Sequence, residues 1–129
     1  MKELFVIALS ICLFQMAEAS TCFVEEASPE AAENYADRVG ISTERRGSLS
    51  DVDVILPATA DGYALSEVFF VVSKEESDVN EVSIPVAARE VNEETLGASF
   101  TLPISLLQRA SLIVTYGRCG AEYQLKLGK

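Results

Sequence analysis

SLIVTYGRCGAEYQLKLGK, residues 111–129, contains two runs in which apolar residues occupy every second position. These positions are Leu112, Val114 and Tyr116 in the first run, and Ala121, Tyr123, Leu125 and Leu127 in the second. Period-two alternation on both sides of a short glycine-containing loop, here Gly117–Gly120, predicts a β-hairpin with one buried face. The tip of the hairpin carries Cys119, and we expect the fold to close around a bond between this residue and Cys22.

Residues 1–19 have the three regions of a secretory signal peptide. Lys2 gives a positive start, Leu4–Phe14 is apolar apart from Ser10, and Ala17-Glu18-Ala19 is a small-x-small cleavage site. We predict cleavage after Ala19, which leaves one domain of residues 20–129. The apolar run is shorter than the ~20 residues that a transmembrane helix needs. We therefore expect a secreted or periplasmic protein with no membrane span in the mature chain.

Two cysteines remain after this cleavage, because Cys12 leaves with the signal peptide. Export places Cys22 and Cys119 in an oxidising compartment, which favours a disulfide bond between them. Closing a loop of about 100 residues contributes roughly 4–5 kcal/mol in the chain-entropy treatment. The alternative is a lipid anchor on Cys22, but the preceding residues do not resemble a bacterial lipobox, and this alternative leaves Cys119 without a partner.

The strand pattern repeats along the whole mature chain. Predicted strands start at Thr21, Asp51, Leu65, Val79, Thr95, Ser111 and Ala121. About seven short strands with turn signals between them are typical of an all-β, immunoglobulin-like antiparallel β-sandwich. One short N-terminal helix is predicted over Pro29–Val39, with Ser28 as its cap and proline at its first position. The alternative is an α+β fold with this helix on a single antiparallel sheet.

Four segments carry more specific expectations. Ile41–Ser50 is polar and is predicted to be a loop, with a weak strand at its beginning as the alternative. The unbroken apolar run Val68–Val72 indicates a central strand that is covered on both faces. Val79–Glu90 is predicted as one strand, and Pro85 in its middle indicates an edge position or a bulge. Ile104–Arg109 is expected to form a helical turn that crosses between the sheets.

Composition excludes several classes of function. The chain has no histidine and no tryptophan, so it lacks the commonest general base, the commonest metal ligand and an obvious platform for sugars. A bridged Cys119 leaves no free thiol as a nucleophile. The net charge is −10, and it becomes −9 without the signal peptide, which disfavours nucleic acid as a partner. We therefore expect neither an enzyme nor a cofactor.

Few side chains stand out as candidate site residues. Asp51 and Asp53 point to the same side of one predicted strand, and are weak candidates for a calcium site. We interpret them instead as the solvent face of that strand. Arg118, beside the predicted disulfide, is the first candidate for a protein interface, followed by the pair Arg45 and Arg46.

These observations favour an exported, non-catalytic protein-binding or structural module, such as an inhibitor or an accessory subunit. It would be a monomer or a weak oligomer, and would bind an unknown protein partner through its loops or through the edge strand Val79–Glu90. The alternative hypothesis is a small calcium- or carbohydrate-binding domain that uses Asp51 and Asp53.

Overall fold

The computed structural model of the 129-residue chain describes residues 25–74, 80–118 and 120–128. The signal peptide, Cys22 and Cys119 lie outside these residues. Cleavage after Ala19 and the disulfide bond therefore remain predictions. None of the helices in the described part of the chain is long and apolar enough to cross a membrane.

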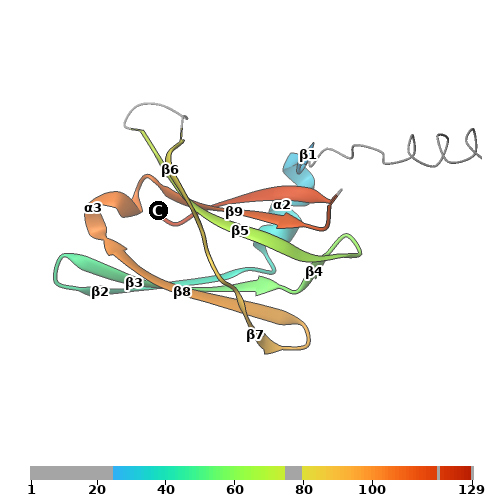
Figure 1. Ribbon diagram of the computed structural model, residues 1–129, viewed down its shortest axis with the longest axis horizontal. Coiled ribbons are helices and arrows are strands. Elements are labelled where there is room, and N and C mark those ends of the chain that lie inside the picture. Colours follow the sequence, from blue (N-terminus) through green and yellow to red (C-terminus); the bar gives the residue numbers. More distant parts are fainter. Residues whose placement is uncertain (1–24, 75–79, 119, 129) are drawn as a thin grey trace, which may run out of the picture.

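The described strands form two facing layers (Figure 1). The strands of the first sheet are β1 (Glu25–Glu26), β10 (Ala121–Lys126), β9 (Ala110–Tyr116), β5 (Tyr63–Ser73), β4 (Thr59–Ala60) and β6 (Asn80–Pro85). The second sheet contains, in spatial order, β2 (Gly40–Arg46), β3 (Leu49–Pro57), β8 (Thr95–Pro103) and β7 (Arg89–Asn92). Two helices accompany them, α2 (Pro29–Ala36) and α3 (Ile104–Leu107).

The order of the strands confirms the predicted immunoglobulin-like sandwich. The spatial order β2-β3-β8-β7 corresponds to strands A-B-E-D of that fold. The order β10-β9-β5-β6 corresponds to strands G-F-C with an added C′. The pairings are antiparallel except that of β1, which lies parallel to β10. Two facing sheets are incompatible with the single-sheet alternative.

Alternating side chains from both sheets form the core, as the period-two runs predict. Strand residues that are buried to at least 96% include Val52, Val54, Leu56, Val68, Ala98, Leu102, Leu112, Val114, Tyr116 and Tyr123. The hairpin of β9 and β10 is confirmed, and supplies four of these residues. β5 is also confirmed as a central strand, since it pairs with β9 on one side and with β6 on the other.

Helix α2 begins where predicted and ends earlier. The Ser28 hydroxyl accepts a hydrogen bond from the Ala31 amide at 3.2 Å, as expected of an N-cap. Its last turn tightens, because the amides of Arg38 and Val39 donate to carbonyls three residues back. The chain then enters β2 at Gly40 instead of completing the predicted helix to Val39.

The prediction of a loop over Ile41–Ser50 is wrong, and the strand that was the alternative at its beginning is longer than expected. β2 occupies most of it and pairs with β3 in an unbroken register from Gly40 to Arg46. All seven side chains of β2 are exposed, so the strand has no buried face and shows no apolar alternation. A two-residue turn with Gly47 at φ 62° connects β2 to β3.

The predicted strand Val79–Glu90 is divided between the two sheets. β6 ends at Pro85, residues 86–88 cross the side of the sandwich, and β7 starts at Arg89 in the opposite sheet. Proline ends the pairing because it has no N–H to donate. The predicted edge position is confirmed: among the described strands, β6 pairs only with β5. α3 joins β8 to β9 and so crosses between the sheets, as predicted.

Candidate functional site

The two aspartates lie on the outer face of β3, where Asp51 is half-buried and Asp53 is exposed. Asp51 accepts hydrogen bonds from Arg46 at 2.9 Å and from the Thr101 hydroxyl at 2.6 Å, and also forms an ion pair with Arg46. The hydrogen bonds from Arg46 and Thr101 lower the pKa of Asp51. The Ser99 hydroxyl donates to Asp53.

This outer face therefore resembles a solvated strand surface rather than a metal centre. Its carboxylates are engaged by side chains of neighbouring strands. In the part of the chain that the structure describes, no group of three or more acidic, histidine or cysteine side chains could hold a metal ion.

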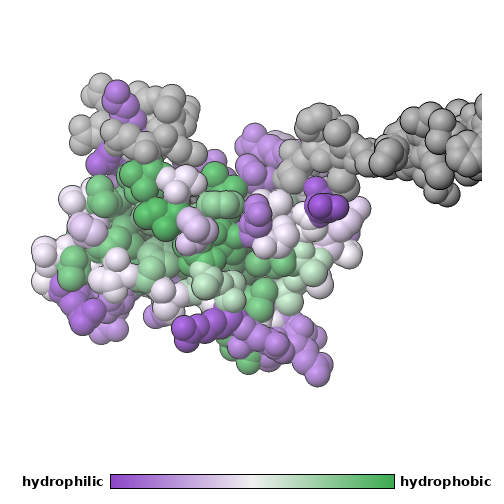
Figure 2. All heavy atoms as spheres, in the orientation of Figure 1, coloured by the Kyte–Doolittle hydropathy of each residue, from purple (hydrophilic) through white to green (hydrophobic). Residues whose placement is uncertain are grey.

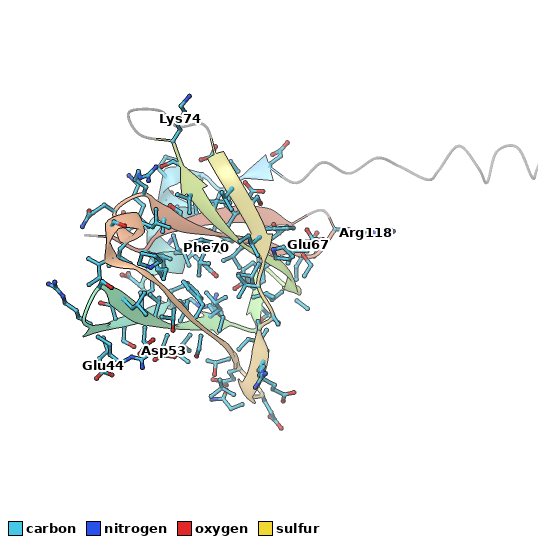
Figure 3. The ribbon with its side chains drawn as sticks, turned by 60° about the vertical axis from the view of Figure 1, so that its left-hand side comes forward. Glu44, Asp53, Glu67, Phe70, Lys74 and Arg118 are labelled. Carbon is cyan, nitrogen blue, oxygen red and sulfur yellow. The ribbon has the colours of Figure 1, made fainter. Side chains whose placement is uncertain are left out.

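The three candidate arginines do not form one surface. Arg45 donates to the Gly47 carbonyl and Arg46 pairs with Asp51, both at the turn after β2. Arg118 is exposed in the turn after β9, at the opposite end of the sandwich. Figure 3 shows Glu44, the neighbour of Arg45, and Arg118 at these two ends.

Helix α2 is held by three packed tyrosines, Tyr35, Tyr116 and Tyr123, named here the tyrosine cluster. The rings of Tyr35 and Tyr123 stack with centroids 4.0 Å apart, and both meet Tyr116 edge-on. Because the Tyr116 hydroxyl donates to the Pro57 carbonyl at 2.8 Å, its oxygen accepts from the Tyr35 hydroxyl, also at 2.8 Å. The Tyr123 hydroxyl donates to Asp61 at 2.9 Å.

Desolvation by burial is the largest cause that raises the pKa of each phenol in the tyrosine cluster. The hydroxyls are engaged by other protein groups, and their rings fasten α2 across one end of the sandwich. We interpret the tyrosine cluster as structural, because its hydroxyls are committed to neighbouring groups and only a hollow of about 150 Å³ adjoins it.

The sandwich is open beneath β6. In the sheet register, Val82 pairs with Val72, and Ile84 pairs with Phe70, so these side chains share the face that elsewhere forms the core. Yet Val82 is 43% exposed and Ile84 is 50% exposed. The second sheet therefore leaves the inner face of β6 partly uncovered.

An apolar groove of about 670 Å³ lies at this open part of the sandwich. We call it the edge groove and define it by Phe70, Ile84 and Val86 from one layer, and Phe100 and Leu102 from the other. Phe70 and Phe100 meet edge-to-face at 5.4 Å between ring centroids, and so bridge the two sheets. Figure 2 shows apolar side chains gathered over the middle of this face, between polar margins.

The backbone of β6 is also directed outwards at alternate residues. The Val86 amide donates to the Val68 carbonyl at 2.8 Å, so the backbone N–H of Val86 faces β5. The amide and carbonyl of successive residues in a strand alternate in direction, so those of Val82 and Ile84 also face β5. The backbone amide and carbonyl of Ser83 and the Pro85 carbonyl therefore face away from β5.

The chain matches no protein-family model, no curated protein and no solved structure. The function has to be inferred from the geometry. The edge groove offers apolar contacts and backbone hydrogen-bonding groups, and Arg89 is the one charged side chain in its lining. This combination suits the binding of an extended peptide segment rather than a chemical reaction.

Sequence reasoning identified the edge strand but missed the edge groove. Val82 and Ile84 alternate with polar residues, as they would in any strand with one buried face. The groove depends on how residues of the two layers face each other, and no local pattern encodes that relation.

Proposed function

We propose that this protein is an exported, non-catalytic module that binds a protein partner along the open edge formed by β6 and the edge groove. The observation that carries the proposal is the exposure of Val82 and Ile84 on the core-facing side of an edge strand. An uncovered apolar strand of this kind is unfavourable in water and invites pairing with another chain.

Three further features support this proposal. The N-terminal sequence has the three regions of a secretory signal peptide, which supports export. The lack of histidine disfavours catalysis. The bonded state of Asp51 and Asp53 disfavours the alternative calcium or carbohydrate site on that face.

Site-specific photo-crosslinking in the cells that produce the protein tests the proposal. A photoreactive amino acid replaces Ile84 in one variant, and replaces Asp53, on the outer face of the opposite sheet, in a matched control. We expect a discrete crosslinked partner from position 84 and none from position 53.

The opposite pattern, with crosslinks from position 53 alone, would refute the proposal. A rise in melting temperature on adding calcium, lost when Asp51 and Asp53 are both replaced by asparagine, would favour the alternative hypothesis, because a ligand stabilises the state that it binds.

A further inference from the structure

We propose that the partner contributes an extended C-terminal tail, which adds to β8 as a strand inside the edge groove and places its terminal carboxylate at Arg89. This inference rests on the proposed function and specifies which part of a partner the edge groove takes.

The open side of β8 offers backbone groups for strand addition. β8 pairs with β3 along its whole length, but in the described part of the chain its other side pairs with β7 through Thr95–Gly97 alone. The Ile104 amide, directly after β8, donates to the Ser48 carbonyl at 3.0 Å and so faces β3. Backbone groups of successive residues alternate in direction, so those of Ser99 and Thr101 face away from β3, on the open side.

Both ends of β8 support this assignment. The Glu94 carbonyl, directly before the strand, accepts from the Ala58 amide at 2.8 Å and so has the same direction as the Ile104 amide. The register between the two strands is unbroken from one end to the other. Pro103 is placed where its missing N–H belongs to the open side, which is the position that a sheet tolerates for proline.

The edge groove lies along this open side. Its lining includes Ser99 and Thr101 together with Phe100 and Leu102, so the groove follows the unpaired length of β8. A strand added here would continue the line of β7 and extend the second sheet beneath β6. It would thereby cover the inner face of β6, which is exposed in this structure.

Alternation in the sheet specifies the side chains of the tail. A residue opposite Phe100 would point inward, because paired residues share one face of a sheet. It would there meet the rings of Phe70 and Phe100, whose edge-to-face contact bridges the two layers, and an aliphatic side chain suits this surface. Residues opposite Ser99 and Thr101 would point outward, to the face where both hydroxyls donate to aspartates and polar side chains stay in water.

Arg89 specifies the end of the tail. It pairs with Gly97 at the start of β7, and β7 occupies the edge of β8 from there on, so an added strand has to stop at Arg89. A strand antiparallel to β8, as β3 and β7 are, would bring its C-terminal end to this stop.

The charge at this stop selects a carboxylate. Arg89 is exposed and is the one charged side chain in the groove lining. Among the described residues, its side chain has no partner in an ion pair or a hydrogen bond. A guanidinium in this state suits a terminal carboxylate, to which it can donate two parallel hydrogen bonds, and it opposes an N-terminal ammonium group.

A second copy of this chain offers no such tail among its described C-terminal residues. Ala121–Lys126 forms β10, the Leu127 amide donates to the Ala110 carbonyl at 3.0 Å, and Leu127 is only 4% exposed. Use of this segment as an added strand would require its separation from β9. The tail of another protein is therefore the better occupant.

Titration of the purified protein with synthetic peptides tests the inference. The probe is a seven-residue peptide in which valine alternates with threonine and which ends in a free carboxylate. Its control is the same peptide with a C-terminal amide. We follow backbone amides by NMR in about 0.15 M salt, which screens distant charges. We expect shifts at Ser99 and Thr101, and about fivefold weaker binding of the control, near the upper value for a solvent-accessible ion pair.

Matched variants separate the role of the charge from that of the backbone. Arg89→Gln should remove most of the preference for the free carboxylate, whereas Arg89→Lys should keep part of it. Ser99→Pro removes an outward N–H and should weaken both peptides about tenfold. It should leave the pairing with β3 intact, because this N–H faces the open side. Ser99→Ala also lacks the hydroxyl but keeps the N–H, and should bind like the wild type.

Three outcomes would overturn the inference. Equal binding of the free carboxylate and the amide would make an internal segment the occupant. A dimer of the protein alone, seen by sedimentation and lost in Ser99→Pro, would make the occupant a second copy. If Ser99→Pro fails to fold, peptides that are N-methylated at single positions replace it. Methylation should then weaken binding at alternate positions, and equal effects at all positions would exclude strand addition.

The crosslinking experiment separates this inference from the proposed function. A crosslinked partner at position 84 that persists in Ser99→Pro would overturn strand addition to β8 and leave the proposed function intact. The absence of any crosslink from position 84 in the otherwise unchanged protein would count against both.

Discussion

Replacing single hydroxyls in the tyrosine cluster should give unequal losses of stability. Tyr35 donates to Tyr116, and Tyr116 donates to the buried carbonyl of Pro57. In Tyr35→Phe, the Tyr116 hydroxyl loses one accepted bond but keeps its own acceptor. The expected loss of unfolding free energy is about 1 kcal/mol, the usual net value of one hydrogen bond.

Tyr116→Phe should cost much more, because it leaves two buried groups without partners. The Tyr35 hydroxyl loses its acceptor and the Pro57 carbonyl loses its donor. Each unsatisfied group costs about 1–3 kcal/mol, so the expected loss is about 3–4 kcal/mol.

The double variant Tyr35→Phe/Tyr116→Phe leaves only the Pro57 carbonyl unpaired. It should therefore be more stable than Tyr116→Phe alone, by about 1 kcal/mol or more.

Urea unfolding followed by far-ultraviolet circular dichroism measures all four proteins, with Tyr63→Phe as a control at a 45% exposed tyrosine. The control should stay within about 0.5 kcal/mol of the wild type. If the double variant is less stable than Tyr116→Phe by the full cost of Tyr35→Phe, then Tyr35 does not donate to Tyr116 as described here.

Three other predictions concern processing and pH. The mass of the secreted protein should start at Ser20 and rise by about two hydrogens on reduction, whereas a lipid-sized excess on Cys22 would exclude the bridge. The lowered pKa of Asp51 means that its contribution to stability is present above its unfolded pKa, near 4, and is lost as the pH falls through the folded value. Asp51→Asn should therefore flatten the acid limb of a plot of stability against pH, and an unchanged limb would contradict this role. The raised pKa values in the tyrosine cluster mean that, above pH ~10, the unfolded chain releases protons that the folded chain keeps. Unfolding free energy should then fall with rising pH and fall less in Tyr35→Phe, as urea midpoints at pH 9 to 11 would show.

The sequence predicts best those segments in which apolar residues recur at a simple period because one face is buried. β9 and β10 alternate because one face meets the core, so their hairpin could be predicted directly. Pro85 predicted an edge position, because proline has no N–H to donate and is therefore rarely found inside a sheet. The sequence pattern did not predict the length of β2, because its residues are all exposed and it is held to β3 by backbone pairing.

The candidate site was harder to predict, because it depends on distant segments. Phe70 and Phe100 lie on different sheets, and their contact depends on how the layers face each other. The pairing of Arg46 with Asp51 across a hairpin was hidden by the wrong assignment of β2 as a loop. Arg45 and Arg46 stand out as a basic pair in an acidic sequence, and Arg118 stands out by its place beside the predicted disulfide. Neither signal says whether these arginines share a surface.

Pro85 and the irregularity between Val72 and Ser73 bound the usable length of β6 at its two ends. An exposed edge normally risks endless sheet growth, in which each added strand becomes the template for the next. Here the template is only a few residues long, and the chain turns away to the other sheet directly after it. The short template therefore lets the protein keep an open sheet edge with little tendency to seed fibrils.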